Sequence, residues 1–444
     1  MRELFELIIL DFHRRLKRGD LPQPVKRDIR LPFLPQKVSA VIGIRRGGKT
    51  WFLLQKIKEL QSEGVPLEKI LYLNFEDERL LPISGRDLDV LLQVYQGLYP
   101  QVVGGGGYLF LDEIQNVPGW ELFVRRVSEQ EGLQIVVTGS SAKLLSREIA
   151  TCLRGRSIPV EVFPLSFKEF LRFHGLEVPT PLRVDSQLRA KIVNLFKEYM
   201  RVGGFPEVQS YTELDRFYTL QEYVRSIVFR DIVERYGVRN IWALKQIIAF
   251  VLQNPAALLS VNRLFRYLKS LGVRVDKNFV YEIADYLQDV YFAFLVPKFT
   301  YSEKARQVSP SKLYLIDQGL IISHLKRPTP DWGRLLENMV FLELRRHPFG
   351  LEYYRSEGAE VDFVVTERLS GRRVGVQVSL SLRAIDTRER EFSALREIVG
   401  KGIVDSALVI TLEEEESEFQ QEELPFRLIP AWRFLLQAEE CLFG

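Results

Sequence analysis

Residues Gly43–Thr50, GIRRGGKT, match the pattern G-x-x-x-x-G-K-[ST]. The stretch before it, Val38–Ile42, is short and largely apolar, and it predicts a buried strand. The stretch after it, Trp51–Leu60, carries apolar side chains at helical spacing. A glycine-rich turn between a strand and a helix is the local context of a phosphate-binding loop, so the sequence predicts a nucleotide site here.

The residue types of this loop indicate how a nucleotide would be held. Glycines allow consecutive N–H groups to curl around a polyphosphate, and the N-terminus of the following helix adds its positive dipole. We expect Lys49 to reach the β- and γ-phosphates and the Thr50 hydroxyl to bind Mg²⁺, so ATP and Mg²⁺ are the expected cofactors. The residues expected to contact the nucleotide are Gly43, Ile44, Arg45, Arg46, Gly47, Gly48, Lys49 and Thr50.

A second motif indicates hydrolysis. The apolar run Tyr108–Leu111 predicts a strand that ends in Asp112 and Glu113. A carboxylate at the C-terminal end of a parallel strand beside the phosphate loop holds Mg²⁺, usually through water, so Asp112 joins Thr50 as a metal residue. Glu113 can act as the general base that polarises the attacking water. Alone, the pair could be an acidic turn; together with the loop it predicts an ATPase.

Further polar residues complete the expected catalytic set. The run Gln134–Val137 leads to Thr138 and Ser140, and a polar side chain at this strand tip can contact the γ-phosphate or the attacking water. Ser140 could equally cap the next helix. Arg156, with Arg154 as second choice, could stabilise the γ-phosphate of a neighbouring subunit. The expected catalytic residues are therefore Lys49, Glu113, Thr138, Ser140 and Arg156.

These motifs and several later ones resemble the AAA+ type ATPases of archaea and bacteria that carry a C-terminal domain of unknown function. The resemblance covers nearly the whole chain. It implies that the strand carrying Thr138 lies between the phosphate-loop strand and the strand carrying Asp112, and that Arg156 reaches across subunits of a homo-oligomer. The stretches that make the resemblance specific are GGFP at 203–206, KLYLID at 312–317 and GAEVDFV at 358–364.

The composition fits a soluble globular protein, with 46% hydrophobic and 27% charged residues. The net charge is only +3, so a role with nucleic acid must depend on local patches such as HRRLKR at 13–18 and KRDIR at 26–30. No apolar run reaches the length of a membrane span, and no cleavage pattern follows Met1, so we expect a cytoplasmic protein without a membrane partner. The two cysteines and four scattered histidines predict neither a disulfide framework nor a catalytic zinc.

The expected fold class is α/β: a P-loop AAA+ core with a parallel sheet, a helical lid, a winged-helix domain and a C-terminal nuclease-like α/β domain. Strand and helix signals alternate in the core, and the pattern then becomes helical. The expected segments are an N-terminal helical and basic segment at 1–35, the P-loop ATPase core at 36–163, the lid at 164–240, the winged helix at 241–325 and the nuclease-like domain at 331–444.

The winged-helix segment leaves two kinds of partner open. Ser260 and Asp276 are expected to cap two helices, and a polar loop at 300–311 is expected to join two wing strands. In nucleic-acid binders the second helix enters the major groove and is basic. Here it carries three carboxylates and one cation, Lys277, which slightly favours protein docking over DNA. The residues that could still contact a DNA backbone are Arg263, Arg266, Lys269, Arg274, Lys304 and Arg306.

The last segment resembles the PD-(D/E)XK nuclease fold. A helix with Glu337 precedes a strand with Asp362, and a second strand carries Gln377 and Ser379. The resemblance implies a Mg²⁺ site at these four positions, but glutamine is a poor ligand for a hard cation and serine cannot replace the lysine of the fold. Glu360 is one further acid. We therefore expect the four residues to converge in one pocket that cuts nothing.

Three functions follow from these features. The first is a Mg²⁺-dependent ATPase that couples ATP binding and hydrolysis to remodelling or binding of DNA. The second is a nucleotide-controlled switch that docks a protein partner through the winged helix. The third is an ATP-dependent nuclease.

Overall fold

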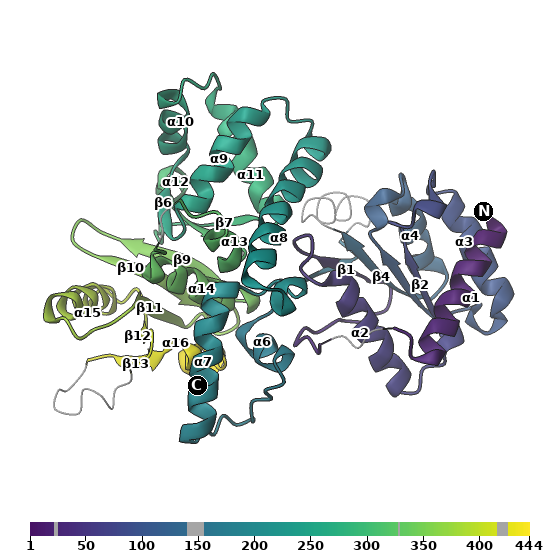
Figure 1. The fold of residues 1–444 in the computed structure, drawn as a ribbon, viewed down its shortest axis with the longest axis horizontal. Helices are drawn as coiled ribbons and strands as arrows, with labels where there is room; N and C mark the ends of the chain where they lie inside the picture. Colours follow the sequence, from purple (N-terminus) through teal and green to yellow (C-terminus); the bar gives the residue numbers. More distant parts are fainter. Residues whose placement is uncertain (22–24, 140–154, 327–328, 415–424) are drawn as a thin grey trace. The chain divides into compact units, whose positions relative to one another are not determined.

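The computed structural model describes residues 1–21, 25–139, 155–326, 329–414 and 425–444 (Figure 1). The chain forms two compact units, Met1–Phe163 and Pro164–Gly444. Ser140 and Arg154 lie outside the described residues. In the part that the structure describes, no helix is long and apolar enough to cross a membrane.

A five-stranded parallel sheet forms the centre of the N-terminal unit, in the order β2-β3-β4-β1-β5 (Figure 1). The strand with Thr138, β4, lies between β1 and the strand that ends at Asp112, β3, as the family resemblance implies. Because all five strands are parallel, their carboxyl ends meet at one edge of the sheet. The α/β class is therefore confirmed. The strands are β1 Val38–Ile42, β2 Ile70–Asn74, β3 Tyr108–Asp112, β4 Gln134–Gly139 and β5 Ser157–Glu161.

Helices pack on this sheet through their apolar faces. Phe52 and Ile57 of α2 share a buried cluster with Val41 of β1 and Phe110 of β3, which fixes the helix that follows the phosphate loop. The first helix, α1, packs against α3 and β2. The helices are α1 Arg2–Arg18, α2 Lys49–Ser62, α3 Asp87–Leu98 and α4 Trp120–Gln130, with short 3-10 turns at η1 Leu67–Lys69, η2 Glu78–Leu80, η3 Pro100–Val102 and η4 Ile114–Asn116.

The second unit begins with helices. Gly203, with φ of 78°, ends α7 and separates it from the next helical segment, as Gly and Pro at 203–206 predict. The helix α8 continues directly into a π-helical stretch, η7. The elements are α6 Phe167–Phe173, α7 Ser186–Val202, η6 Glu207–Ser210, α8 Glu213–Ser226 and η7 Ile227–Glu234.

Next comes a segment of five helices and three strands whose sheet has the antiparallel order β6-β8-β7. The predicted caps are present: Ser260 accepts from the N–H of Arg263, and Asp276 from that of Phe279. The stretch 300–311 is not only a loop, because Ser302 caps a short helix, α12, inside it. The elements are α9 Ile241–Gln253, β6 Ala257–Leu259, α10 Val261–Ser270, α11 Lys277–Asp289, β7 Ala293–Val296, α12 Glu303–Val308, β8 Ser311–Leu315 and α13 Gln318–Ile322.

The C-terminal part holds a mixed sheet in the order β13-β12-β11-β10-β9, in which β9, β10 and β11 are antiparallel and β11, β12 and β13 parallel. The helix α15 connects β11 to β12 and packs on β10 and β11 (Figure 1). The elements are α14 Trp332–Arg346, β9 Gly350–Arg355, β10 Glu360–Thr366, β11 Arg373–Ser379, α15 Ile385–Gly400, β12 Ser406–Thr411, β13 Arg427–Pro430, α16 Ala431–Phe434 and α17 Ala438–Phe443.

Two of the motifs that carry the family resemblance, GGFP and KLYLID, meet at the buried carboxylate of Asp317. Its Oδ2 accepts from the N–H of Gly204 at 2.6 Å, and its Oδ1 from the N–H of Gly319 at 2.8 Å. A Cβ at Gly203 would lie only 2.3 Å from Asp317 Oδ1, so this backbone can approach the carboxylate only without a side chain. These motifs therefore have a structural role: they join the helical part of the second unit to the loop after β8.

Candidate active site

Glycine residues give the phosphate loop its shape. Gly43 has φ of 150°, and a Cβ there would lie 2.1 Å from the carbonyl oxygen of Val162. The N–H of Gly47 donates to the carbonyl of Ile44 at 3.1 Å, and Gly48, with φ of 99°, is the N-cap of α2. The loop therefore curls over the N-terminus of α2, where helix-end N–H groups and the helix dipole favour an anion.

Lys49 extends over this loop with its side chain only 4% exposed. Its ammonium donates to the carbonyl oxygens of Gly43 at 3.2 Å and Ile44 at 3.3 Å. The same ammonium lies 3.8 Å from Glu113 Oε1. The structure thus places the cation of the loop beside the acidic motif at the end of β3.

Three hydroxyl groups surround Asp112, which is fully buried. Asp112 Oδ2 accepts from Thr50 Oγ1 at 2.8 Å and from the Tyr72 hydroxyl at 3.0 Å, and Oδ1 accepts from Thr138 Oγ1 at 2.5 Å. Burial and the neighbouring charge of Glu113 raise the pKa of Asp112 above its ordinary value, while the three hydroxyls lower it. This arrangement brings Thr50, Asp112 and Thr138 together as the sequence predicts.

Glu113 has a left-handed backbone, with φ of 53°, directly after β3. Its N–H donates to Thr138 Oγ1 at 2.8 Å, so one threonine hydroxyl contacts both acidic residues. Its carboxylate accepts from Gln115 Nε2 at 2.5 Å. A non-glycine residue in this conformation is strained by about 1–3 kcal/mol, and such strain is common where a side chain must be held for function.

Arg156 does not join the other site residues of its own chain. It precedes β5, whose first residue pairs in register with Val38 at the start of β1, whereas the phosphate loop follows the end of β1. Arg156 therefore lies at the opposite edge of the sheet, where it forms an ion pair with Glu129. Its expected role toward a neighbouring subunit stays a prediction. In the loop itself, Arg45 forms an ion pair with Glu76 at 3.4 Å.

The structure adds Tyr72 and Arg27, which the sequence analysis missed as site residues. Arg27 is buried, and its guanidinium donates to the carbonyls of Gly47 at 3.2 Å and Phe163 at 2.6 Å, so it supports the phosphate loop from behind. Of the basic cluster at 26–30, Arg27 is thus not available at the surface, whereas Lys26 and Arg30 are exposed. Neither residue belongs to a recognisable motif, because each reaches the site from a segment other than the phosphate loop and the acidic motif.

The other basic cluster, at 13–18, also contains a buried residue. The Nε2 of His13 lies 2.8 Å from the carbonyl oxygen of Ile70, and its Nδ1 lies 2.9 Å from the Tyr99 hydroxyl. A ring with one carbonyl and one hydroxyl partner is satisfied as the neutral tautomer. Burial lowers the pKa of His13, in agreement with this arrangement.

The predicted convergence in the C-terminal part is correct for three of four residues. Glu337 and Asp362 both contact Lys312, and Gln377 Oε1 accepts from the N–H of Asp362 at 3.1 Å. The Ser379 hydroxyl instead donates to the carbonyl of Ser381 at 3.1 Å. Among the described residues, no group of three or more histidine, cysteine or acidic side chains is arranged to hold a metal ion. The nuclease-like interpretation stays a prediction.

Comparisons with known proteins divide the chain into three matched regions. Residues 35–171 match the family model described as an AAA domain. Residues 193–331 match a domain of unknown function, DUF8612, and residues 332–433 match another, DUF4143.

Two curated relatives are similar over most of their length, and both are uncharacterized. A protein of Methanocaldococcus jannaschii is 34% identical over 98% of this chain and 95% of its own. A protein of Haemophilus influenzae is 31% identical over 78% of this chain and 83% of its own.

A more distant likeness is to a solved structure, the Aeropyrum pernix ORC1 protein in complex with DNA, with 14% identity and a TM-score of 0.29 over 74% of this chain and 93% of that one. With an AAA domain match over the phosphate loop and the acidic motif, and a DUF4143 match at the C-terminus, the chain belongs to the family of P-loop AAA ATPases that carry this C-terminal domain.

Proposed function

We propose that this protein is a Mg²⁺-dependent ATPase of the AAA+ type that couples ATP binding and hydrolysis to the binding or remodelling of DNA. The observation that carries the ATPase part is the array of Lys49, Thr50, Asp112, Glu113 and Thr138 at one edge of the parallel sheet. The observation that carries the DNA part is an exposed set of cations on α10, α11 and the turn between them.

The residues at the sheet edge fit Mg²⁺ together with a nucleotide. Thr50 Oγ1 and Asp112 Oδ2 are oxygen donors 2.8 Å apart, and hard cations prefer oxygen ligands. When bound, Mg²⁺ neutralises charge on the phosphate oxygens. Thr50 and Asp112 would hold it, the latter through water.

The remaining side chains divide the chemical work. Lys49 would turn from the loop carbonyls to the β- and γ-phosphates, which removes its contact with Glu113. Glu113 would then accept a proton from the attacking water as general base. Thr138 would keep both acidic residues in position, because its hydroxyl bonds to the side chain of one and the N–H of the other.

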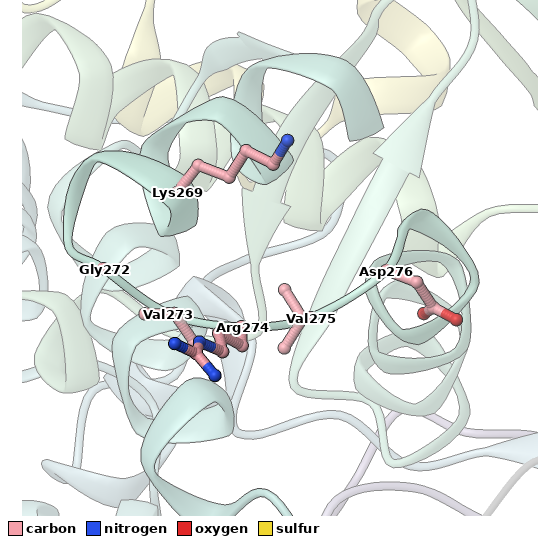
Figure 2. A pocket seen from close by; sticks show the side chains of 6 residues that line it. All are labelled: Lys269, Gly272, Val273, Arg274, Val275 and Asp276. Carbon is pink, nitrogen blue, oxygen red and sulfur yellow. The ribbon is translucent and has the colours of Figure 1, made fainter.

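The proposed DNA-binding surface consists of cations that are all exposed. Figure 2 shows the hollow at the end of α10, which Lys269, Arg274 and Asp276 line together with Gly272, Val273 and Val275. The carboxylate of Asp276 caps α11 and so is already engaged. In the described part of the chain, no carboxylate forms an ion pair with any of these cations. Arg263 donates to the carbonyl of Leu258 at 2.8 Å, and the Lys269 ammonium lies over the Phe265 ring. Because no carboxylate neutralises them, these exposed charges can attract phosphate groups. The surface, named the α10 cation surface here, comprises Arg263, Arg266, Lys269, Arg274 and Lys277.

A second candidate, a protein-docking switch, is favoured by a different face of the same segment. On α11, Tyr281 is 58% exposed, and Glu282 and Asp285 are exposed beside it. An exposed aromatic ring next to carboxylates is unfavourable against phosphates but suits a basic protein surface. This candidate predicts that charge removal from the α10 cation surface has no effect on partner binding.

Salt-dependent DNA binding separates the two candidates. We would measure the affinity of the full-length protein for a fluorescent duplex from 50 to 200 mM salt, with and without ATP, and compare Arg266→Gln/Lys269→Gln with the wild type. If both cations contact phosphates, the slope of log affinity against log salt should fall by about 1.8, or about 0.9 per contact.

A charge-matched control is available on the exposed face of α7. Lys191→Gln/Arg201→Gln removes one lysine and one arginine, as the test variant does, so it reports the effect of net charge alone. If the two double variants weaken DNA binding equally, the α10 cation surface is not the contact. If the wild type binds no DNA in either nucleotide state, the docking switch replaces the DNA proposal.

A further inference from the structure

A buried lysine ammonium lies at the centre of the C-terminal acidic cluster. Lys312, in β8, has a side chain that is only 2% exposed. Its Nζ lies 2.7 Å from Asp362 Oδ1, 3.0 Å from Glu337 Oε1 and 3.1 Å from Glu360 Oε1. An ammonium has three N–H donors, so each donor has one carboxylate partner.

Other polar groups of the cluster also form hydrogen bonds. The Tyr314 hydroxyl donates to Glu337 Oε1 at 2.6 Å, and the N–H of Val378 donates to Asp362 Oδ2 at 2.8 Å. Gln377 uses its carbonyl on the N–H of Asp362 and its amide on Glu391 at 2.6 Å. Both polar groups of Gln377 therefore already have a partner within the protein.

The charges explain why this lysine stays protonated. Burial lowers the pKa of an amine, but the negative charges of Asp362, Glu337 and Glu360 outweigh burial and raise the pKa of Lys312 above its ordinary value. Without the ammonium, two almost fully buried carboxylates would face each other with little compensation. The lysine and the carboxylates therefore require one another.

We propose that Lys312 is the resident cation of this cluster: its ammonium occupies the position between Glu337 and Asp362 that a divalent cation would need, and it fastens β8 to the C-terminal sheet. The contact links KLYLID, where Lys312 is the first residue, to GAEVDFV, which contains Glu360 and Asp362. The cluster therefore has a structural role and binds no metal. This inference does not depend on the proposed ATPase or DNA roles.

The test removes the Lys312 ammonium and asks whether added Mn²⁺ can replace it. In the nucleotide-free, full-length protein, Lys312→Ala should melt several degrees below the wild type, because it leaves buried carboxylates unpaired. Millimolar Mn²⁺ should restore part of that loss in Lys312→Ala and leave the melting temperature of the wild type unchanged. The double variant Lys312→Ala/Asp362→Asn should lose the response to Mn²⁺.

A matched control and a second measurement complete the test. Lys304→Ala removes an exposed lysine from the neighbouring α12 and should neither destabilise the protein nor create a response to Mn²⁺. If Lys312→Ala gains no stability from Mn²⁺, the ammonium does not stand in for a cation. If Lys312→Ala does not fold, Mn²⁺ titration of the wild type decides: a bound ion that disappears in Asp362→Asn would overturn the proposal, and no such ion would support it.

Discussion

The ammonium of Lys49 lies 3.8 Å from Glu113 Oε1, and both side chains are almost buried, at 4% and 11% exposed. The cation expected to bind the phosphates and the carboxylate expected to activate water therefore neutralise one another. A nucleotide that draws Lys49 to its phosphates would free Glu113. We expect this exchange to couple nucleotide binding to activation of the general base.

The first prediction concerns Glu113→Gln. The variant should bind ATP at least as tightly as the wild type, because Lys49 loses a charged competitor of the phosphates. Its hydrolysis should fall by roughly 10²–10⁴-fold, the range for loss of a general base. Single-turnover hydrolysis and binding of a fluorescent ATP analogue measure the two effects separately.

Lys49→Ala is the companion variant, and it should lose nucleotide binding altogether. If Glu113→Gln hydrolyses ATP at the wild-type rate, then another residue activates the water and the role proposed for Glu113 is wrong.

The second prediction concerns the hydroxyl of Thr138. Thr138→Val keeps the size of the side chain but removes the hydrogen bonds to Asp112 and to the N–H of Glu113. We expect kcat to fall by roughly one to two orders of magnitude, since an unsatisfied buried group costs about 1–3 kcal/mol, while ATP binding changes little. Thr138→Ser retains the hydroxyl and should recover most of the rate. Equal rates in the two variants would show that the hydroxyl does not position the acidic residues.

The sequence predicts the centre of the nucleotide site because the motif fixes it locally. In the phosphate loop, the conformations of Gly43 and Gly48 and the placement of Lys49 follow from eight consecutive residues. Asp112 was predictable because a short apolar strand ends there. Arg27 and Tyr72 were not predictable, because their partners are far away in the sequence and come close only in the folded chain. No motif links residues at such separations.

The C-terminal cluster shows a signal that could have been used. Lys312, Asp362 and Glu337 are each single charges within largely apolar segments, SKLYL, VDFVV and LLENMVF. Buried charges require partners, so isolated charges of opposite sign in such segments predict one another. The nuclease resemblance instead implies that Glu337 and Asp362 are remnants of a metal site, and it assigns no role to Lys312.

The third prediction concerns Arg156, which lies at the sheet edge opposite its own phosphate loop. If it acts on the nucleotide of a neighbouring subunit, then Arg156→Ala and Lys49→Ala should each be inactive alone. A mixture should recover activity, because some sites combine an intact loop with an intact arginine. Activity of mixtures is measured over a range of ratios at concentrations where light scattering detects oligomers. Absence of recovery under those conditions would exclude action between subunits.

The fourth prediction concerns pH and His13. Burial lowers the pKa of His13 below its ordinary value of 6.5, so the folded protein binds a proton there less readily than the unfolded chain. The free energy of unfolding is therefore unaffected by protonation of His13 above pH 6.5. As the pH falls below 6.5, protonation of His13 in the unfolded chain lowers the free energy of unfolding by at most about 1.4 kcal/mol per pH unit.

Urea unfolding of the wild type and His13→Gln at pH 8, 7, 6 and 5.5 tests this sign. Glutamine does not titrate, so the free energy of unfolding should fall less steeply with acidity in the variant than in the wild type. Parallel curves would show that His13 does not account for any acid sensitivity.

The last prediction is that the C-terminal part cuts no DNA. Lys312 occupies the centre of the acidic cluster, Gln377 is engaged with Asp362 and Glu391, and Ser379 supplies no positive charge. In the nuclease fold that this part resembles, acidic residues and a lysine surround a Mg²⁺ site, whereas Lys312 neutralises the acids of this cluster. Incubation of the protein with supercoiled, linear, branched and single-stranded DNA, with Mg²⁺ or Mn²⁺ and with or without ATP, should leave every substrate intact. Cleavage that disappears in Asp362→Ala would identify an active site in this cluster, and its loss in Lys49→Ala as well would make the ATP-dependent nuclease the leading function.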